Sequence, residues 1–297
     1  MAIVRKLRGT DPKTITPSKP KVLIYGPPGA GKTWASLEFP SVYYIDTEGG
    51  ADLDHYTDKL KASGAAYLGP NDGACDFPTV LDEIQTLATT QHDRKTLVID
   101  SFSKLFNTQL AITAEAMEKA GKEDAFGASK KQAIAYTRRM VAWFGKLDMN
   151  VVLICHQRSQ WKDGKEVGLT FDGWDKLEYE LHLALRIAKQ GTSRKAFVGK
   201  TRLVPFPEGE CFDWSYSEFA KRYGKEVMEA AALPAQLATK EQVAEFKDIL
   251  GRIKMEAATR EKLDAEEPSE MEVSKMIKWL TWLRGQDAAQ TDKTPAA

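Results

Sequence analysis

The sequence has few cysteines and no long apolar segment. Its three cysteines stand far apart, at Cys75, Cys155 and Cys211, and no two of them form a CxxC pair. An odd, scattered set excludes a disulfide framework and a cysteine-based zinc site, and it is typical of a reducing cytoplasm. The apolar runs fall far short of the about 20 residues that cross a bilayer. The N-terminal MAIVRKLRG also lacks the apolar core of a signal peptide. We therefore expect a cytoplasmic protein without a membrane partner.

An excess of charge of either sign is also absent. Lysine and arginine together number 42, and aspartate and glutamate also number 42, so the formal net charge is zero. This balance excludes a histone-like polycation and an acidic-tail protein, whereas a local basic stripe is still enough to bind nucleic acid. The 297 residues, 42% of them hydrophobic, suffice for one large domain with its own core, alone or with a small appendage.

Short apolar runs alternate with longer amphipathic stretches over residues 21–207. The runs are rich in β-branched and aromatic residues and end at polar residues or glycine, as buried parallel strands do. Residues 179–187 and 195–198 flank Gln190-Gly-Thr-Ser193, which predicts an antiparallel hairpin at the edge of the sheet. We predict an α/β fold with a mostly parallel central sheet, whose strands include residues 22–25, 42–45, 97–99 and 151–154.

Composition divides the rest of the chain into further segments. The N-terminal residues contain three prolines and no periodic apolar pattern. After the predicted core, the short apolar runs typical of strands no longer occur. Thr239 and Gln242 match a capping box, a second such box spans residues 269–272, and apolar residues follow each at helical spacing. The predicted segments are an arm (1–20), a linker (208–238), a small helical module (239–285) and a disordered polar tail (286–297).

A phosphate-binding loop is the strongest motif. The pattern GxxxxGK[ST] is matched by Gly26, Pro27, Pro28, Gly29, Ala30, Gly31, Lys32 and Thr33, between a predicted strand and a predicted helix. Glycines let backbone N–H groups turn toward phosphate oxygens, lysine neutralises the β- and γ-phosphates, and the threonine hydroxyl holds Mg²⁺. We predict ATP and Mg²⁺ as cofactors, with Trp34, the next residue, also contacting the nucleotide. The alternative is an ordinary glycine-rich turn before a helix.

Two carboxylates at predicted strand ends complete this chemistry. Asp100 closes the run Thr96-Leu-Val-Ile-Asp100, and we expect it to hold Mg²⁺ through water. The following residue is Ser101, so the glutamate that follows this aspartate in many P-loop ATPases is missing. Hydrolysis needs a carboxylate that orients the attacking water, and Glu48, in Asp46-Thr-Glu48, is the candidate. Asp46 is the alternative base, and a solvated acidic corner without a catalytic role is the other interpretation.

These motifs form an ordered series that resembles the RecA-like core ATPases. The series is GPPGAGKT, YIDTEGGAD, LVIDS, VVLICHQR, and then a hairpin with LEYELHLALRI and AFVGKTRLVPF, covering residues 21–207. Within this family the chain looks most like the Sak-type single-strand annealing ATPases of bacteriophages, whose neighbours are described as phage nucleotide-binding proteins. The resemblance implies a RecA-like P-loop core, and a bacterial host cytoplasm as the location if a phage encodes the chain.

The resemblance also implies roles for individual residues. Glu48 matches the catalytic glutamate of the family, and Asp52 and His55 fall where the family contacts adenine, with Tyr56 as the alternative stacking residue. Gln157 matches the glutamine that senses the γ-phosphate and leads into the second DNA-binding loop. His156 departs from the asparagine that RecA has before this glutamine. The alternative is that His156 and Gln157 only cap the end of a strand.

The resemblance further implies that ATP lies between subunits. Lys200 and Arg202 occupy the stretch from which hairpin cations reach the neighbour's γ-phosphate, although the alignment slips by one residue. They are candidates for fingers acting in trans, and the alternative is that they form surface salt bridges. Activity in trans requires an oligomer, so we expect self-association as a filament or ring.

Two regions have the composition of a single-strand binding surface. The first runs over residues 124–132 and includes Lys130 and Lys131. The second runs from Arg158 to Lys176 as a predicted loop, in which cations interleave with aromatic residues. Cations track phosphates and rings stack on bases, so both regions are candidates for DNA contact. The alternative is a solvated loop whose tryptophans pack on the core, and Trp174 suits either interpretation. The DNA-binding candidates are Lys130, Lys131, Arg158, Trp161, Lys162 and Lys165.

Three functions follow from these features. The leading hypothesis is a DNA-dependent ATPase of phage recombination or replication that binds single-stranded DNA as an oligomer and promotes annealing or strand pairing. The second is a nucleotide-gated DNA-binding module that hydrolyses little ATP, which requires that Glu48 has no catalytic role. The third is a RecA-like NTPase that acts on a protein partner through residues 158–176. The helical module 239–285 is a candidate docking site for a single-strand binding protein or a partner nuclease.

Overall fold

A computed structural model describes residues 18–50, 54–124 and 127–291 of the chain. It divides into two compact units at the boundary between Leu233 and Pro234. Cys75, Cys155 and Cys211 are all unpaired. Over the described ranges, no helix is long and apolar enough to cross a membrane.

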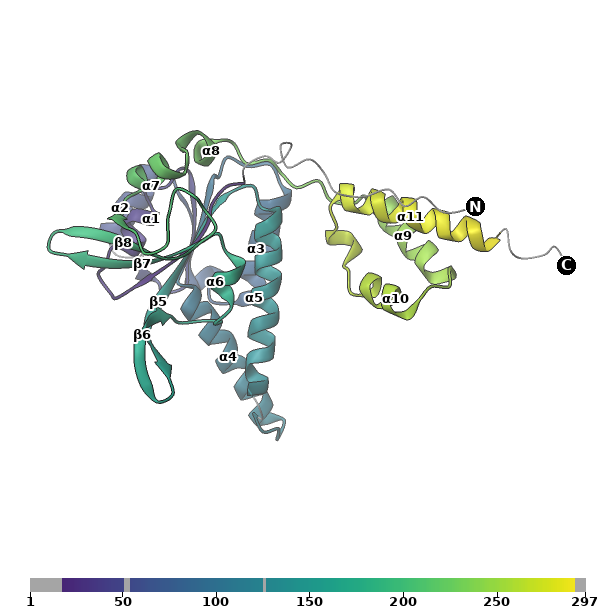
Figure 1. The fold of residues 1–297 in the computed structure, drawn as a ribbon, viewed down its shortest axis with the longest axis horizontal. Coiled ribbons are helices and arrows are strands. Elements are labelled where there is room, and N and C mark those ends of the chain that lie inside the picture. The colour runs from purple at the N-terminus through teal and green to yellow at the C-terminus, as the bar shows by residue number, and fades with distance from the viewer. Residues whose placement is uncertain (1–17, 51–53, 125–126, 292–297) are drawn as a thin grey trace. The chain divides into compact units, whose positions relative to one another are not determined.

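The first unit is built on a nine-stranded sheet (Figure 1). The strand order is β3-β2-β4-β5-β1-β7-β8-β9, and β6 pairs with β5 off this path. Pairing is parallel from β3 to β7 and antiparallel in β5–β6, β7–β8 and β8–β9. The strands are β1 (Lys21–Gly26), β2 (Val42–Asp46), β3 (Ala66–Leu68), β4 (Thr96–Asp100), β5 (Asn150–Lys162), β6 (Lys165–Phe171), β7 (Leu183–Gln190), β8 (Ser193–Thr201) and β9 (Cys211–Asp213).

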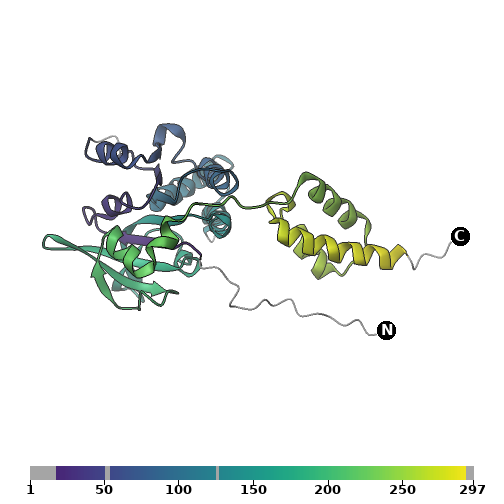
Figure 2. The ribbon, with the colours of Figure 1, turned by 90° about the horizontal axis from the view of Figure 1, so that it is seen from above.

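Helices cover both faces of the parallel strands (Figures 1 and 2). On one face, alternate residues of the central strands share a buried apolar cluster with α1 (Lys32–Ser36), α7 (Tyr216–Tyr223) and α8 (Lys225–Glu229). The buried faces of α3 (Phe77–Thr89), α4 (Phe102–Lys119) and α5 (Ala128–Lys146) lie on the other side. Two shorter helices, α2 (Asp54–Ser63) and α6 (Leu177–Glu180), complete this unit, with a 3₁₀ turn at Pro70–Asp72.

Burial on both faces explains why the central strands are readable from the sequence. All five residues of β4 are buried, as are five of the six in β1, so each strand is a continuous apolar run. The predicted fold class, an α/β core with a mostly parallel sheet, an antiparallel edge hairpin and C-terminal helices, is confirmed. The three-residue β3 was not predicted, because it is only partly buried and too short to form a pattern.

The predicted linker 208–238 is wrong over most of its length. Residues 211–229 form β9, α7 and α8, and they belong to the first unit. Phe212, Trp214 and Phe219 are buried in its core, and the Phe219 ring lies 5.7 Å from that of Phe39. The apolar residues of this segment follow no regular period, because their positions suit contacts with distant residues rather than one helix face. Sequence periodicity therefore missed them.

The predicted loop from Arg158 to Lys176 is also different in the structure. β5 continues past the sheet and turns back as β6, so residues 157–171 form an antiparallel hairpin with a bulge between Gln160 and Trp161. Figure 1 shows this β5–β6 hairpin extending away from the sheet, as the β7–β8 hairpin also does. The hairpin is mostly exposed on both faces, so it lacks the alternation of apolar and polar residues that identifies a half-buried strand.

The arm is partly described. Residues 1–17 lie outside the described residues, but Lys19 is buried and its ammonium donates to the carbonyls of Asp148, Ala230 and Ala231. The core therefore begins before residue 21.

In residues 234–291, the described part of the second unit, three helices form: α9 (Lys240–Arg252), α10 (Ala257–Asp264) and α11 (Val273–Thr291), with a 3₁₀ turn at Pro268–Glu270. The capping box of Thr239 and Gln242 is confirmed. The second predicted box is wrong, because Ser269 lies in the 3₁₀ turn and its hydroxyl donates to Glu267. α11 continues to Thr291, into the predicted disordered tail. An ion pair between Arg252 and Asp287 at 2.6 Å holds this extension.

Candidate functional site

The P-loop lies between β1 and α1. Gly31 has φ of 84°, in the left-handed region that favours glycine. Gly26 ends β1 beside β7, and a Cβ on it would lie 2.1 Å from the carbonyl oxygen of Ile187. Both glycines are therefore required, one by backbone conformation and one by the close approach of a neighbouring strand.

The Lys32 ammonium lies at the P-loop backbone. It donates to the carbonyl oxygens of Gly26 at 2.8 Å and Pro27 at 3.0 Å. Burial lowers the pKa of Lys32, while the carboxylates of Asp100 and Glu48 act in the opposite direction. The ammonium is thus a partly desolvated cation at the loop, in the position to meet phosphate oxygens.

Thr33 and Asp100, the two predicted Mg²⁺ ligands, lie in contact. The Thr33 hydroxyl donates to Oδ2 of Asp100 at 2.5 Å, and the Tyr44 hydroxyl donates to the same oxygen at 3.1 Å. Burial raises the pKa of Asp100 to about 6, although the hydrogen bond from Thr33 acts to lower it. A hydroxyl and a carboxylate are hard oxygen ligands, the kind that Mg²⁺ accepts together with phosphate oxygens and water. No group of three or more His, Cys, Asp or Glu side chains in the described part could hold a metal alone.

Glu48 belongs to a hydrogen-bonded trio. Its Oε1 accepts from the Ser101 hydroxyl at 2.6 Å and lies 2.6 Å from Nε2 of His156. The Ser101 Oγ also lies 3.2 Å from Nε2 of His156. Burial acts to raise the pKa of Glu48, but the hydrogen bonds from Ser101 and His156 outweigh it, so the pKa is lowered. Glu48 is therefore held as a carboxylate, the form that accepts a proton from water.

Asp46 has a different environment. It is buried, and its Oδ1 accepts the backbone N–H groups of Glu48 and Gly49, each at 2.9 Å. These bonds fix the turn that carries Glu48, so the geometry favours Glu48 over Asp46 as the base.

A cavity of about 480 Å³ collects the predicted phosphate and metal residues. Because β5 runs parallel to β1 and pairs His156 with Gly26, Gln157 reaches the same edge of the sheet. The Gln157 Oε1 is buried and has no hydrogen-bond partner among the described residues. This amide oxygen is an acceptor, so water in the cavity can satisfy it, whereas a phosphate oxygen cannot. The cavity is lined by Gly26, Pro28, Gly29, Lys32, Thr33, Glu48, Asp100, His156 and Gln157.

The adenine-contacting residues are only partly described. Asp52 lies outside the described residues, as does the side chain of His55. The ring of Tyr56, the alternative stacking residue, lies 6.3 Å from the ring of Trp34. The Lys59 ammonium lies 3.7 Å from the centroid of Trp34. Trp34 and Tyr56 thus share one aromatic cluster beside the P-loop.

Arg194 was missed by sequence reasoning. A Cβ on Gly31 would lie 2.1 Å from its Nε, so the guanidinium lies against the P-loop. That Nε is buried and lacks a hydrogen-bond partner within the described part of the chain. Burial raises the pKa of Tyr56, and the charge of Arg194 opposes this shift, which places the guanidinium near the aromatic cluster as well. The only available signal was its place at the turn of a predicted hairpin.

Lys200 and Arg202 do not lie at this chain's own P-loop. β7 runs parallel to β1, and the register of β8 pairs Lys200 with Ala184, toward the end of β7 that is away from Gly26. Lys200 donates to the carbonyl of Leu181, and Arg202 donates to that of Tyr179. A nucleotide that Lys200 or Arg202 contacts must therefore be bound to the P-loop of another subunit.

The DNA-binding candidates lie on three elements, α5, β5 and β6. Lys130 and Lys131 are exposed in the first turns of α5, and Arg158, Trp161 and Lys162 follow one another along β5. Lys165 begins β6. Trp161 is 64% exposed, whereas Trp174 is only 9% exposed and lies 5.4 Å beneath the guanidinium of Arg138. Lys130 and Arg158, from different elements, line one cavity.

A family model described as "AAA domain" matches residues 18–206. Among solved structures, the RadB recombinase is similar with a TM-score of 0.43 and 18% identity, over 66% of this chain and 86% of that one. No curated protein matches the sequence. The family model covers well over half of the chain, so this protein belongs to the AAA domain family and is a P-loop ATPase.

Proposed function

We propose that the protein binds and hydrolyses ATP and binds single-stranded DNA, as an oligomer that promotes strand annealing or pairing in phage recombination or replication. One observation carries this proposal. β5 lines the nucleotide cavity with Gln157 and continues directly into the exposed hairpin that bears Trp161 and Lys162. A change at the γ-phosphate that moves Gln157 is thereby transmitted along one strand to the DNA-binding candidates.

The roles within the nucleotide cavity follow from the contacts. Lys32 neutralises the β- and γ-phosphates, and Thr33 and Asp100 hold Mg²⁺. Bound Mg²⁺ supplies charge neutralisation of the phosphates. Glu48, a carboxylate secured by Ser101 and His156, orients the attacking water and accepts its proton. Gln157 donates its amide N–H to the γ-phosphate. This hydrogen bond is lost when the γ-phosphate leaves after hydrolysis.

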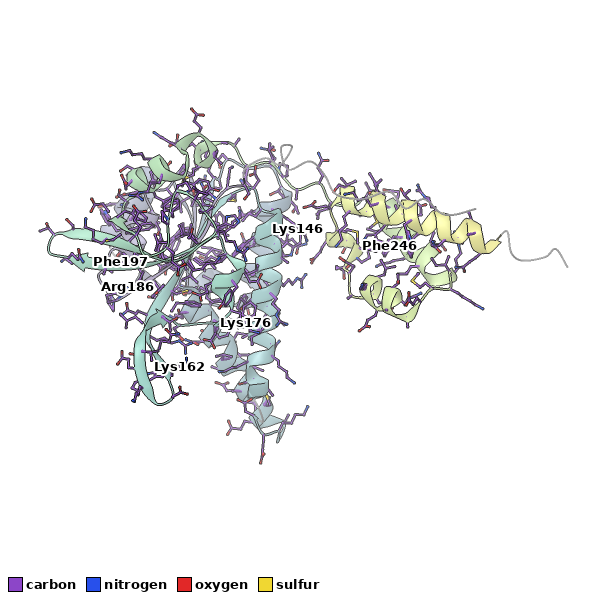
Figure 3. All side chains as sticks on the ribbon, in the orientation of Figure 1. Lys146, Lys162, Lys176, Arg186, Phe197 and Phe246 are labelled. Carbon is purple, nitrogen blue, oxygen red and sulfur yellow. The ribbon has the colours of Figure 1, made fainter. Side chains whose placement is uncertain are left out.

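The charges near the hairpin support DNA as the ligand. Figure 3 labels Lys162 on the β5–β6 hairpin and Lys176 close to α6. Together with Lys130, Lys131, Arg158 and Lys165 they give a local set of cations on a chain whose net charge is zero. Such a set binds phosphates electrostatically and makes affinity depend on salt.

The oligomeric part of the proposal rests on Lys200 and Arg202. These cations lie away from their own P-loop, which suits a role at the ATP site of the next subunit in a filament or ring. The second unit, residues 234–297, provides a separate helical body for a partner such as a single-strand binding protein or a nuclease. If a phage encodes the chain, the protein is located in the cytoplasm of the bacterial host.

A protein ligand is the second candidate. Val167 and Leu169 on β6 are 55% and 40% exposed, so the hairpin also presents aliphatic side chains that DNA does not require. In that case the same strand would transmit the nucleotide state to a protein partner.

Fluorescence anisotropy of labelled single-stranded DNA, with and without ATP, separates these functions. We expect binding that ATP strengthens, and that Lys32→Ala makes insensitive to ATP. The matched variant Lys119→Ala, on the exposed end of α4, should behave as wild type. Nucleotide-independent or undetectable binding by the wild type would contradict the proposed function.

A further inference from the structure

Two cavities lie on either side of Arg158. The first, of about 470 Å³, lies between the β5–β6 hairpin and α6, and its lining includes Trp161 and Tyr179. The second, of about 250 Å³, lies between α4, α5 and the segment after β6, and its lining includes Lys130 and Lys176. Arg158 and Asp175 line both, so the two cavities are adjacent.

The first cavity has the composition of a base-binding site. Trp161 is 64% and Tyr179 is 61% exposed, so both rings are accessible at its walls. Gln160 and Thr170 supply hydrogen-bonding groups, and Glu178 supplies carboxyl oxygens that accept from ring N–H and amino groups. Asp175 is paired with Arg158, so Glu178 is the carboxylate that repels phosphate, and the cavity suits an uncharged, planar, hydrogen-bonding ligand.

The second cavity has the opposite character. Its cations are Lys130, Lys176 and Arg158, and neither lysine forms an ion pair with another described residue. Its acidic groups are already engaged, because Asp172 accepts from Asn107 at 2.6 Å and Asp175 pairs with Arg158. Unpaired ammonium groups around a small polar cavity suit a phosphate.

Arg158 is fixed between the two cavities. Its Nε donates to the carbonyl of Phe171 at 3.0 Å, and its terminal nitrogen pairs with Asp175. The guanidinium therefore lies at the boundary of the two cavities, where these two contacts hold it.

We propose that the first cavity receives one unstacked base of single-stranded DNA, held by Trp161 and Tyr179, while the second receives a backbone phosphate next to it. This assignment rests on the proposed function, which it deepens by separating the base contact from the phosphate contact. Stacking on aromatic rings tolerates every base, so the site binds without sequence preference.

The test compares an oligothymidylate with an abasic oligonucleotide of the same length and charge. Wild type should bind the thymidylate about tenfold more tightly, the ratio expected from base–aromatic stacking. Trp161→Ala and Tyr179→Ala should remove this preference and leave affinity for the abasic strand unchanged, whereas Trp161→Phe should retain it. Lys130→Ala combined with Lys176→Ala should weaken binding of both strands equally and flatten the salt dependence. ATP binding by each variant reports that it is folded.

The outcomes distinguish failure of the base-binding cavity from failure of DNA binding itself. Tight wild-type binding to both strands with no preference overturns the base cavity and leaves DNA binding intact. Failure of the wild type to bind either strand overturns the proposed function itself. If Trp161→Ala changes neither strand's affinity, the cavity does not receive a base, and its exposed rings belong to a protein interface. The matched substitution Val204→Ala, at another exposed apolar residue, should leave both affinities at wild-type values.

Discussion

Nε2 of His156 lies 2.6 Å from Oε1 of Glu48, and Ser101 donates to the same oxygen at 2.6 Å. Both contacts engage Oε1, and no described residue donates to Oε2. One carboxylate oxygen is thus used to hold the side chain, which leaves the other to accept a hydrogen bond from water. His156, which stands where RecA has asparagine, therefore contacts the carboxylate of the candidate base directly.

Glu48→Gln should preserve ATP binding and lower kcat by at least about 100-fold, because an amide cannot accept the proton of the attacking water. The measurement is steady-state hydrolysis, with nucleotide affinity measured separately by titration. His156→Asn should keep most of the activity, since an amide can still donate to Oε1. Normal hydrolysis by Glu48→Gln would place the base elsewhere.

Arg194→Ala should weaken ATP and ADP binding by about tenfold each, because it removes a cation that lies against the P-loop of the same chain. Arg186→Ala is the matched control, since Arg186 lies on the neighbouring strand and packs 4.3 Å from the centroid of Phe197. Equal nucleotide affinities for the Arg194 and Arg186 variants would show that the guanidinium only packs against Gly31.

Mixing variants tests the trans role of Lys200 and Arg202. Arg202→Ala and Glu48→Gln should each be inactive alone, because each removes a different half of a site shared between subunits. A one-to-one mixture should regain activity, with about a quarter of the interfaces carrying both intact residues. A mixture as inactive as its components would indicate that Arg202 acts only within its own chain, through the carbonyl of Tyr179.

The pH dependence of stability should include a contribution from His182. Burial, with smaller effects from Lys21, Lys200 and Arg202, lowers the pKa of His182 to about 4. The unfolded value is about 6.5, so the unfolded chain takes up the proton first as the pH falls. The contribution of His182 to the free energy of unfolding should therefore decrease from pH 6.5 toward pH 5, in the direction opposite to that of Asp100. His182→Gln should flatten this part of the profile in urea titrations, and an unchanged slope would assign it to other groups.

The sequence revealed the parts of the molecule that local pattern determines. β1, β2 and β4 are short apolar runs because both of their faces are buried, and the P-loop is a contiguous motif with fixed spacing. Asp100 was a candidate because a P-loop requires a second acidic residue at the end of another strand, and it accepts a hydrogen bond from Thr33. These elements can be predicted without knowing which distant residues contact one another.

The features that were missed depend on contacts between residues far apart in the sequence. Arg194 contacts Gly31 only after the β7–β8 hairpin forms beside β1, and nothing in the hairpin sequence shows this. Trp214 and Phe219 become core residues through contacts with Phe39, which follows the P-loop helix and is far from them in the sequence. The β5–β6 hairpin is exposed on both faces, so its residues carry no periodic signal.

The central claim is that one strand, β5, couples ATP turnover to DNA binding in an oligomer. The most direct test is the rate of ATP hydrolysis at low salt, with and without single-stranded DNA, over a series of protein concentrations. The account predicts a rate that DNA stimulates and that rises more steeply than the protein concentration, because the site is completed by a neighbouring subunit. A turnover that is indifferent to DNA and strictly proportional to protein concentration would contradict it.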